Sequence, residues 1–173
     1  MVMAAALALV ASAAAEGPCD ILGAAGNPCV AAHSTVRALF AKYDGPLYNV
    51  SRPDGTSKNI GLLSPGGFAD KKSHDEFCSK MDCVISNVFD QSRCGGKCPA
   101  PGGNHLGQRH KLINASRHSI TVGKAKIPVY GMWFDPGFGM HVDNTTGIAT
   151  GNDPETIYAV SRHYRCHLGC ILL

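Results

Sequence analysis

Residues 110–134, HKLINASRHSITVGKAKIPVYGMWF, decide the fold that we expect for this chain. The stretch divides into three short runs rich in β-branched and aromatic residues, HKLINAS, HSITV and KIPVYGMWF, and a fourth run, ETIYAVS, follows at 155–161. Short runs of this composition, separated by Asn, Gly, Pro and Asp, are typical of β-strands. Many short strands with frequent turns predict a mainly β fold, a β-sandwich or jelly roll.

Three more strands are expected upstream. Residues 46–52 and 57–63 should pair as a hairpin, because Pro53-Asp54-Gly55 between them is a turn signal. Residues 83–89, CVISNVF, predict the clearest buried strand. Residues 93–103 are almost entirely Gly, Pro and Cys, which predicts a loop.

Two short helices are expected near the N-terminus. The first is predicted over residues 32–42, because apolar side chains recur there at helical spacing. These side chains are Val36, Leu39, Phe40 and Tyr43. The second is a single turn at SHDEFC, where Ser73 and Glu76 have the spacing of a capping box and lead into Cys78.

Composition and charge restrict the class of protein. The chain has 173 residues, the length of one domain, and 45% of them are hydrophobic. Its 16 Lys and Arg against 13 Asp and Glu leave a net charge of +3, scattered along the chain. This charge is too small to predict a nucleic-acid or membrane-surface partner. We see no internal repeat and no interdomain linker.

The N-terminus resembles a secretory leader. An apolar run, Val2 to Val10, precedes Ala13-Ala14-Ala15, which fits the small-residue pattern of a cleavage site. We therefore expect residues 1–15 to be a signal peptide and the protein to be secreted. The alternative is a buried N-terminal helix, which the abrupt Gly17-Pro18 disfavours. The run is too short to span a membrane, and no later segment is suited to it.

Secretion changes the interpretation of the cysteines. There are eight: Cys19, Cys29, Cys78, Cys83, Cys94, Cys98, Cys166 and Cys170. An even number in an oxidising compartment predicts disulfides. The cysteines form four close pairs, so short local loops are the simplest of 105 connectivities. In a secreted chain, the sequons at Asn49, Asn114 and Asn144 are candidates for N-glycosylation.

The chain ends in RHYRCHLGCILL, whose four potential zinc ligands would share one face of a helix. They are His163, Cys166, His167 and Cys170. Residues seven apart on a helix are separated by about 10 Å, so the whole set cannot bind one ion. Ligands from Cys94 and Cys98 would be needed, and an oxidising compartment favours disulfides instead. We predict no metal, no cofactor and a loosely held tail over 165–173.

Other potentially catalytic residues have ordinary structural roles in our interpretation. Asp135 and Asp143 flank PGFGMH and are expected to be turn formers, and Asp90 is expected to close a turn at the end of a strand. Trp133 is expected in the core, and His33 in a structural position. The chain has no nucleophilic serine motif.

Several longer segments, GPCDILGAAGNPCVAAHSTVRALF at 17–40, VFDQS, GNHL, VYGMWFDPGFGMHVDNTTGIATG and DPETIYAVSRHY, resemble fungal α-L-arabinofuranosidases of glycoside hydrolase family 54. The resemblance runs to about Tyr164. It implies a secreted, concanavalin-like β-sandwich that removes terminal arabinofuranosyl groups from plant cell-wall polysaccharides and retains anomeric configuration. It also implies the disulfides Cys19–Cys29 and Cys78–Cys83.

The departures from the family limit what carries over. The family's nucleophilic Glu and acid/base Asp lie beyond the matched region, so we assign no catalytic residue. RCGGKCPAPG at 93–102 is inserted, and RCHLGCILL stands where the family has adjacent cysteines. We expect residues 16–164 to be a partial catalytic sandwich, 165–173 a divergent tail, and the chain inactive by itself. The alternative is a small secreted, disulfide-stapled protein that binds a sugar or a partner without catalysis.

Overall fold

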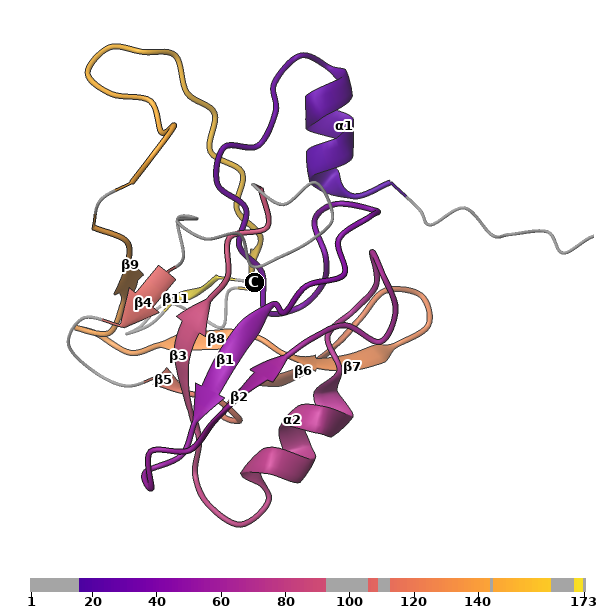
Figure 1. Ribbon diagram of the computed structural model, residues 1–173, viewed down its shortest axis with the longest axis vertical. Coiled ribbons are helices and arrows are strands. Elements are labelled where there is room, and N and C mark those ends of the chain that lie inside the picture. Colours follow the sequence, from indigo (N-terminus) through magenta and orange to yellow (C-terminus); the bar gives the residue numbers. More distant parts are fainter. Residues whose placement is uncertain (1–15, 93–105, 109–112, 144, 163–169, 173) are drawn as a thin grey trace, which may run out of the picture.

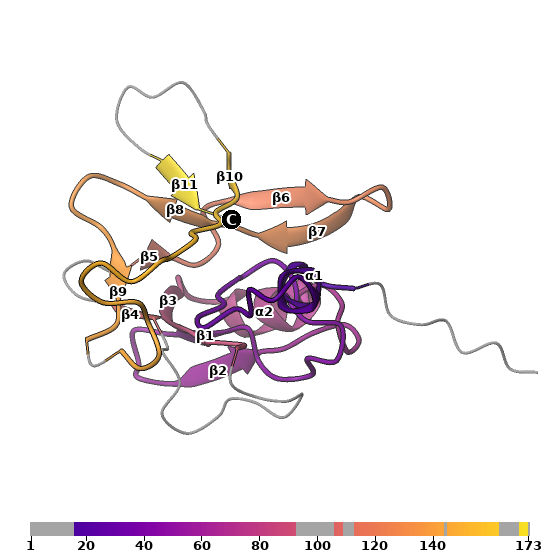
Figure 2. The same cartoon turned by 90° about the horizontal axis from the view of Figure 1, so that it is seen from above.

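The computed structural model describes residues 16–92, 106–108, 113–143, 145–162 and 170–172. Figure 2 shows two layers of strands, with β1, β2, β3 and β4 in one layer and β6, β7, β8 and β11 in the other. All the strand pairs are antiparallel. The expected β-sandwich is therefore confirmed.

The larger layer is a six-stranded sheet with the order β2-β1-β3-β4-β9, and β5 pairs with β3 beside this row. Its strands are β1 (Tyr48–Ser51), β2 (Ser57–Ile60), β3 (Val84–Val88), β4 (Leu106–Gln108), β5 (Ile113–Asn114) and β9 (Met140–His141). The predicted hairpin is confirmed, with Tyr48 opposite Ile60 and Gly55 at φ 85° in the turn. The strand predicted at 83–89 lies in the middle of the sheet, as expected for a buried run.

The second layer contains two smaller sheets. One is the hairpin of β6 (Ser119–Val122) with β7 (Ile127–Tyr130). The other has the order β10-β11-β8, from β8 (Met132–Phe134), β10 (Ser161–Arg162) and β11 (Cys170–Leu172). Strands are therefore present in each run of the opening stretch, but KIPVYGMWF, predicted as one strand, contains two, β7 and β8, which belong to different sheets.

The core lies between these layers. Buried side chains of the larger sheet include Tyr48, Val50, Ile60, Ile85 and Val88. The second layer contributes Ile120, Val129 and Met132. In β1 the buried residues alternate with Asn49 and Ser51, as expected for a strand with one face on the core, whereas in β3 the two buried residues are three apart, where the pairing with β1 shifts register.

The helix predicted over 32–42 is wrong. The structure instead has α1 at Pro18–Ala24, at the top of Figure 1, and α2 at Lys71–Cys78. In α1, Pro18 occupies the first turn and the Asp20 carboxylate accepts the backbone N–H of Gly17 at 2.8 Å. The cap of α2 is Asp70, which accepts from the Ser73 N–H, so the helix begins one turn before the predicted Ser73 cap.

Residues 32–42 form no helix because distant partners take their backbone groups. The N–H of Ala38 donates to the Gly67 carbonyl at 2.8 Å, and the N–H of Leu39 donates to the Gln91 side chain at 2.7 Å. The N–H of Ala41 donates to the Asp20 carboxylate of α1 at 2.6 Å. Helical spacing of apolar residues is a weak signal when tertiary hydrogen bonds compete for the same backbone groups.

The C-terminal segment also differs from the prediction. Residues 155–160 form no strand, and the side chains of Ile157 and Tyr158 are 82% and 65% exposed. Pairing begins only at β10. The tail was expected to be loosely held, yet Cys170–Leu172 form β11, which pairs with both β10 and β8. Residues 163–169 lie outside the described residues.

The two disulfides implied by the resemblance are present. Cys19–Cys29 ties α1 to the segment that follows it, with a Cα–Cα distance of 5.5 Å. Cys78–Cys83 joins the end of α2 to the start of β3, with a Cα–Cα distance of 5.6 Å. Cys94, Cys98 and Cys166 lie outside the described residues, as does the side chain of Cys170.

Removing the first disulfide is expected to lower the free energy of unfolding by roughly 2–3 kcal/mol in the Cys19→Ser, Cys29→Ser double variant, because the short loop is then open in the unfolded chain. Denaturant titration measures the loss. Peptide mapping of the unmodified protein checks the connectivity independently, and any crossed pair with Cys78 or Cys83 would contradict it.

Among the described residues, no helix has the length and apolar character needed to cross a membrane.

Candidate functional site

Asp135 and Asp143 occupy separate surface positions. The backbone carbonyl of Asp135 accepts the Phe138 N–H at 2.9 Å, so Asp135 begins a turn after β8, as predicted. Its carboxylate pairs with Arg117 and accepts the Trp133 Nε1–H at 2.9 Å. Asp143 follows β9 in the other layer, is largely exposed, and lies 3.2 Å from His141 Nε2.

A retaining glycosidase needs two carboxyl groups about 5–5.5 Å apart on either side of the scissile bond. Asp135 and Asp143 follow strands of different sheets, and each carboxylate has a basic partner of its own. This arrangement accounts for both as structural groups and does not present them as a facing acid and nucleophile.

The prediction for Asp90 is confirmed and the prediction for Trp133 is wrong. Asp90 is fully buried, and its carboxylate accepts the N–H groups of Ala32 and Ser92, both at 2.9 Å. It therefore closes a turn just after β3, as expected. Trp133 was expected in the core, and this is wrong: its neighbour Met132 is the buried residue of β8, and Trp133 is partly exposed. Strand alternation gives the two residues opposite faces.

Trp133 belongs to a surface cluster. The Arg117 guanidinium lies over its indole ring at 4.9 Å, and the His118 ring is 5.6 Å from it. One face of the indole is therefore covered by a cation, a contact worth about 0.5–1 kcal/mol at exposed sites. His33 lies in the non-helical segment between buried Ala32 and Ser34, not on the helix in which it was expected.

A polar constellation that the sequence interpretation missed surrounds His74 of α2. His74 is fully buried. Its Nδ1 lies 2.9 Å from the Tyr48 hydroxyl of β1, and its Nε2 lies 3.2 Å from the Ser116 hydroxyl. The Tyr130 ring of β7 packs against the imidazole at a centroid distance of 4.3 Å. His74 thus joins the helix to both layers.

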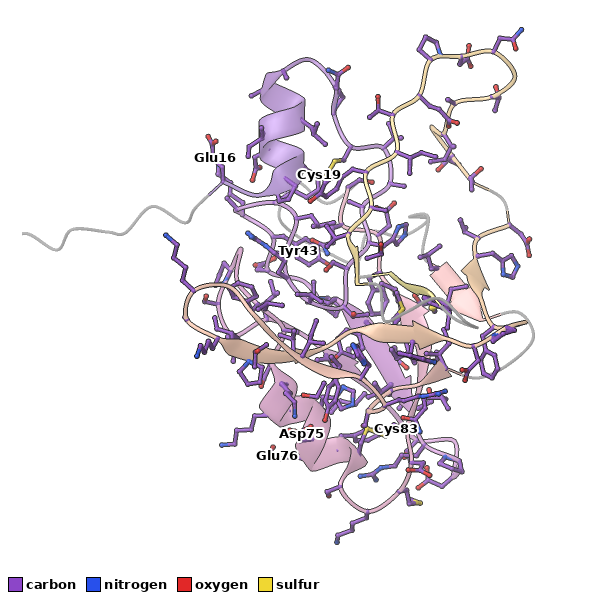
Figure 3. The ribbon with its side chains drawn as sticks, turned by 180° about the vertical axis from the view of Figure 1, so that it is seen from behind. Glu16, Cys19, Tyr43, Asp75, Glu76 and Cys83 are labelled. Atoms are coloured by element: carbon purple, nitrogen blue, oxygen red, sulfur yellow. A yellow bond between two sulfur atoms is a disulfide. The ribbon has the colours of Figure 1, made fainter. Side chains whose placement is uncertain are left out.

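An ion pair completes this constellation at its solvent side. The Tyr130 hydroxyl donates to the Asp75 carboxylate at 2.8 Å, and the Lys71 ammonium donates to the same carboxylate at 2.6 Å. Figure 3 shows Asp75 on the side of α2 that faces the β7 strand. The sequence did contain a signal for the buried histidine, because His74, Phe77 and Cys78 have the i, i+3, i+4 spacing of a core-facing stripe.

The electrostatics of the constellation are those of a structural site. Burial lowers the pKa of His74 to about 4, and the nearby Asp75 only partly opposes this shift. Burial alone would raise the pKa of Asp75, yet the hydrogen bonds from Lys71 and Tyr130 lower it. At neutral pH the imidazole is therefore uncharged, with one ring nitrogen donating and the other accepting. Full burial denies a substrate access to it.

The remaining predicted positions are metal and glycosylation candidates. Among the described residues, no group of three or more His, Cys, Asp or Glu side chains is arranged to hold a metal ion. His163, Cys166 and His167 lie outside them, as does the sequon residue Asn144. The two described sequon residues are Asn49, within β1, and Asn114, at the end of β5.

Comparison with known proteins identifies the family. A family model described as alpha-L-arabinofuranosidase B, catalytic, matches residues 18–172. The chain belongs to this family. The match extends past Tyr164 and through β11, the strand that completes the small sheet with β8 and β10.

Related arabinofuranosidases are similar over most of this chain. Alpha-L-arabinofuranosidase B of Emericella nidulans is 42% identical over 165 residues, which cover 92% of this chain and 32% of the relative. The protein of the same name from Aspergillus oryzae is 42% identical over 169 residues, with 92% and 33% covered. The chain therefore spans about a third of the length of the curated relatives that it matches.

Solved structures of the family have the same fold. A crystal structure of arabinofuranosidase complexed with arabinofuranosyl-alpha-1,2-xylobiose matches with a TM-score of 0.71 and 37% identity, over 79% of this chain and 29% of that chain. A GH54 α-L-arabinofuranosidase soaked with a cyclic sulfate inhibitor matches equally well. Both share the β-sandwich seen in this arabinofuranosidase-family chain.

Proposed function

We propose that this chain forms part of the catalytic β-sandwich of a secreted α-L-arabinofuranosidase, which hydrolyses terminal arabinofuranosyl groups of plant cell-wall polysaccharides and retains anomeric configuration. The observation that carries the proposal is the family match over residues 18–172, together with 42% identity to alpha-L-arabinofuranosidase B of Emericella nidulans. The two disulfides and the leader-like residues 1–15 support passage through an oxidising secretory compartment.

In this proposal, the described residues supply the scaffold and not the two catalytic carboxylates. The most plausible acidic pair by sequence, Asp135 and Asp143, follows strands of different sheets, and each residue already has a basic partner. The polar constellation around His74 is buried and holds α2 between the layers. The acid and nucleophile of the retaining reaction are therefore expected from other segments of a complete domain.

The 173-residue polypeptide alone is expected to release no arabinose from 4-nitrophenyl α-L-arabinofuranoside or from arabinoxylan. Release of 4-nitrophenol and reducing-sugar analysis measure the two reactions. If turnover appears and is abolished by Asp135→Asn or Asp143→Asn, the scaffold assignment is wrong. Retention of the inactive polypeptide on arabinoxylan would instead favour the carbohydrate-binding alternative.

A chimera provides the positive test. Residues 16–164 would replace the matching segment of the Emericella nidulans relative, followed by the rest of that relative. We expect the chimera to hydrolyse 4-nitrophenyl α-L-arabinofuranoside, because this segment contributes the same sandwich strands. Asp135→Asn in the chimera is the matched control and should keep the activity. A folded but inert chimera would contradict the proposal.

A further inference from the structure

We infer that Asn114 is an N-glycosylation site and that Asn49, although it lies in an equally valid sequon, is not modified. This inference rests on the proposed passage of the chain through a secretory compartment. The two triplets are Asn49-Val-Ser51 and Asn114-Ala-Ser116, so the sequence cannot rank them. The structure separates them by backbone conformation, exposure and the partners of the two carboxamides.

Asn114 lies between two buried residues and has an exposed side chain. Ile113 and Ala115 on either side are 1% and 0% exposed, so they anchor the segment in the core. The Ala115 N–H donates to the Cys83 carbonyl at 2.9 Å, which places the sequon beside the Cys78–Cys83 disulfide, whose Cys83 is labelled in Figure 3. Because neighbouring strand residues point to opposite faces, Asn114 is directed to solvent.

The Asn114 carboxamide also has a local conformation suited to modification. Its Oδ1 accepts the Ser116 N–H at 3.0 Å, which closes a turn over the three sequon residues. This turn needs no contact with a distant part of the chain, so it is available to the chain before the sheet is complete. The turn engages the Oδ1 atom of an exposed side chain and does not use its Nδ2 amino group.

Asn49 is in the opposite situation. It lies within β1, with Asn59 of β2 and Asn87 of β3 directly opposite on its two sides. Its Nδ2 donates to Asn59 Oδ1 at 2.6 Å, and its Oδ1 accepts the Ser86 hydroxyl at 2.6 Å. A sugar on Nδ2 would stand between these side chains.

The hairpin that contains Asn49 is also local in sequence. β1 and β2 are joined by the turn at residues 52–56, and hairpins of this kind form in about 1–10 μs. Once the hairpin forms, the Asn49 sequon is an extended strand. The Asn114 sequon, in contrast, is folded into a turn. β5, by contrast, pairs with β3, about thirty residues earlier in the chain, and such non-local pairing is slower.

The proposed modification is an ordinary group transfer. The Asn114 Nδ2 forms a bond to the anomeric carbon of an oligosaccharide that is carried on a polyprenyl diphosphate. The bond between that carbon and the diphosphate oxygen breaks, the diphosphate leaves with the electron pair, and Nδ2 loses one proton to a base of the transferase. The product keeps one N–H and the Oδ1 acceptor, so the turn to Ser116 survives.

The experiment is expression in yeast behind a yeast secretion leader in place of residues 1–15, followed by enzymatic release of N-glycans in heavy-oxygen water and peptide mass spectrometry. Trypsin separates the sequons, because LINASR contains Asn114 and YDGPLYNVSRPDGTSK, in which the Arg52-Pro53 bond resists cleavage, contains Asn49. Secreted and cell-associated protein are both analysed by mass spectrometry, so the glycosylation state is measured even if little protein is secreted. We expect the isotope label on Asn114 and its absence from Asn49.

Variants sharpen the result. Asn114→Gln should lower the apparent mass on a gel by that of one glycan, and Asn49→Gln should leave the apparent mass unchanged. Ser116→Thr keeps the sequon and should keep the Asn114 glycan. An unlabelled Asn114, or a labelled Asn49, would overturn the inference. If Asn114 is modified behind the yeast leader but not behind the chain's own residues 1–15, the proposed secretion fails and the site assignment stands.

Discussion

Gly66→Ala is expected to lower the free energy of unfolding by about 3 kcal/mol or more, as measured by denaturant titration. Gly66 has a φ of 70°, a conformation that strains a residue with a Cβ atom. An added Cβ would also lie well inside contact distance of the Ala41 backbone carbonyl oxygen, which has no flexible side chain to move away. The Gly66 N–H donates to the Tyr43 carbonyl at 2.7 Å, so the turn cannot shift without losing this bond.

Gly55→Ala is the matched control for the steric part of this effect. Gly55 has a similar φ of 85°, in the hairpin turn, but no atom lies within 4 Å of a Cβ added there. We expect a loss of only about 1–2 kcal/mol from backbone strain. Equal losses for the two variants would show that the close approach of Gly66 to Ala41 does not matter for stability.

Stability is expected to fall by about 3 kcal/mol between pH 6.5 and pH 4, because His74 is buried in its uncharged form. Burial lowers its pKa to about 4 from the ordinary value of 6.5, so in this range the unfolded chain binds more protons than the folded one. The contribution is therefore complete above pH 6.5 and is lost as the pH falls to 4. The groups that surround the ring are Tyr48, Lys71, Asp75, Ser116 and Tyr130.

Replacement of the histidine tests the origin of this slope. His74→Gln should flatten the pH dependence between 6.5 and 4 and lower stability at pH 7, since the Tyr48 and Ser116 hydroxyls lose an aligned partner. Glu76→Gln on the same helix is the control, because Glu76 is exposed and forms a long surface ion pair with Lys72. An unchanged slope in His74→Gln would assign the pH dependence to other groups.

The strands were predictable where the determining information is local. The alternation in Tyr48–Ser51 and Ser57–Ile60, with a turn signal between them, specifies a hairpin whatever the rest of the chain does. The strand Val84–Val88 is a short segment rich in β-branched residues, a composition that favours a strand. These segments required no knowledge of their neighbours.

The helices and single-residue sites were less predictable because distant partners decide them. Residues 32–42 have helical apolar spacing, but Gly67, Gln91 and Asp20 take their N–H groups. Residues 155–160 have strand composition, and no strand pairs with them among the described residues. Residue composition favours one secondary structure over another, but the hydrogen-bonding partners available in the folded chain determine which one forms.

The sequence by itself determined the β-sandwich class, the β1–β2 hairpin and the resemblance to the arabinofuranosidases, because alternation, turn chemistry and family motifs are properties of neighbouring residues. Only the tertiary structure decided that His74 is a buried neutral link between the layers, that Trp133 faces outward under Arg117, and that Asn114 and Asn49 differ. Each of these depends on contacts between residues far apart in the chain, whose distances and burial no local pattern specifies.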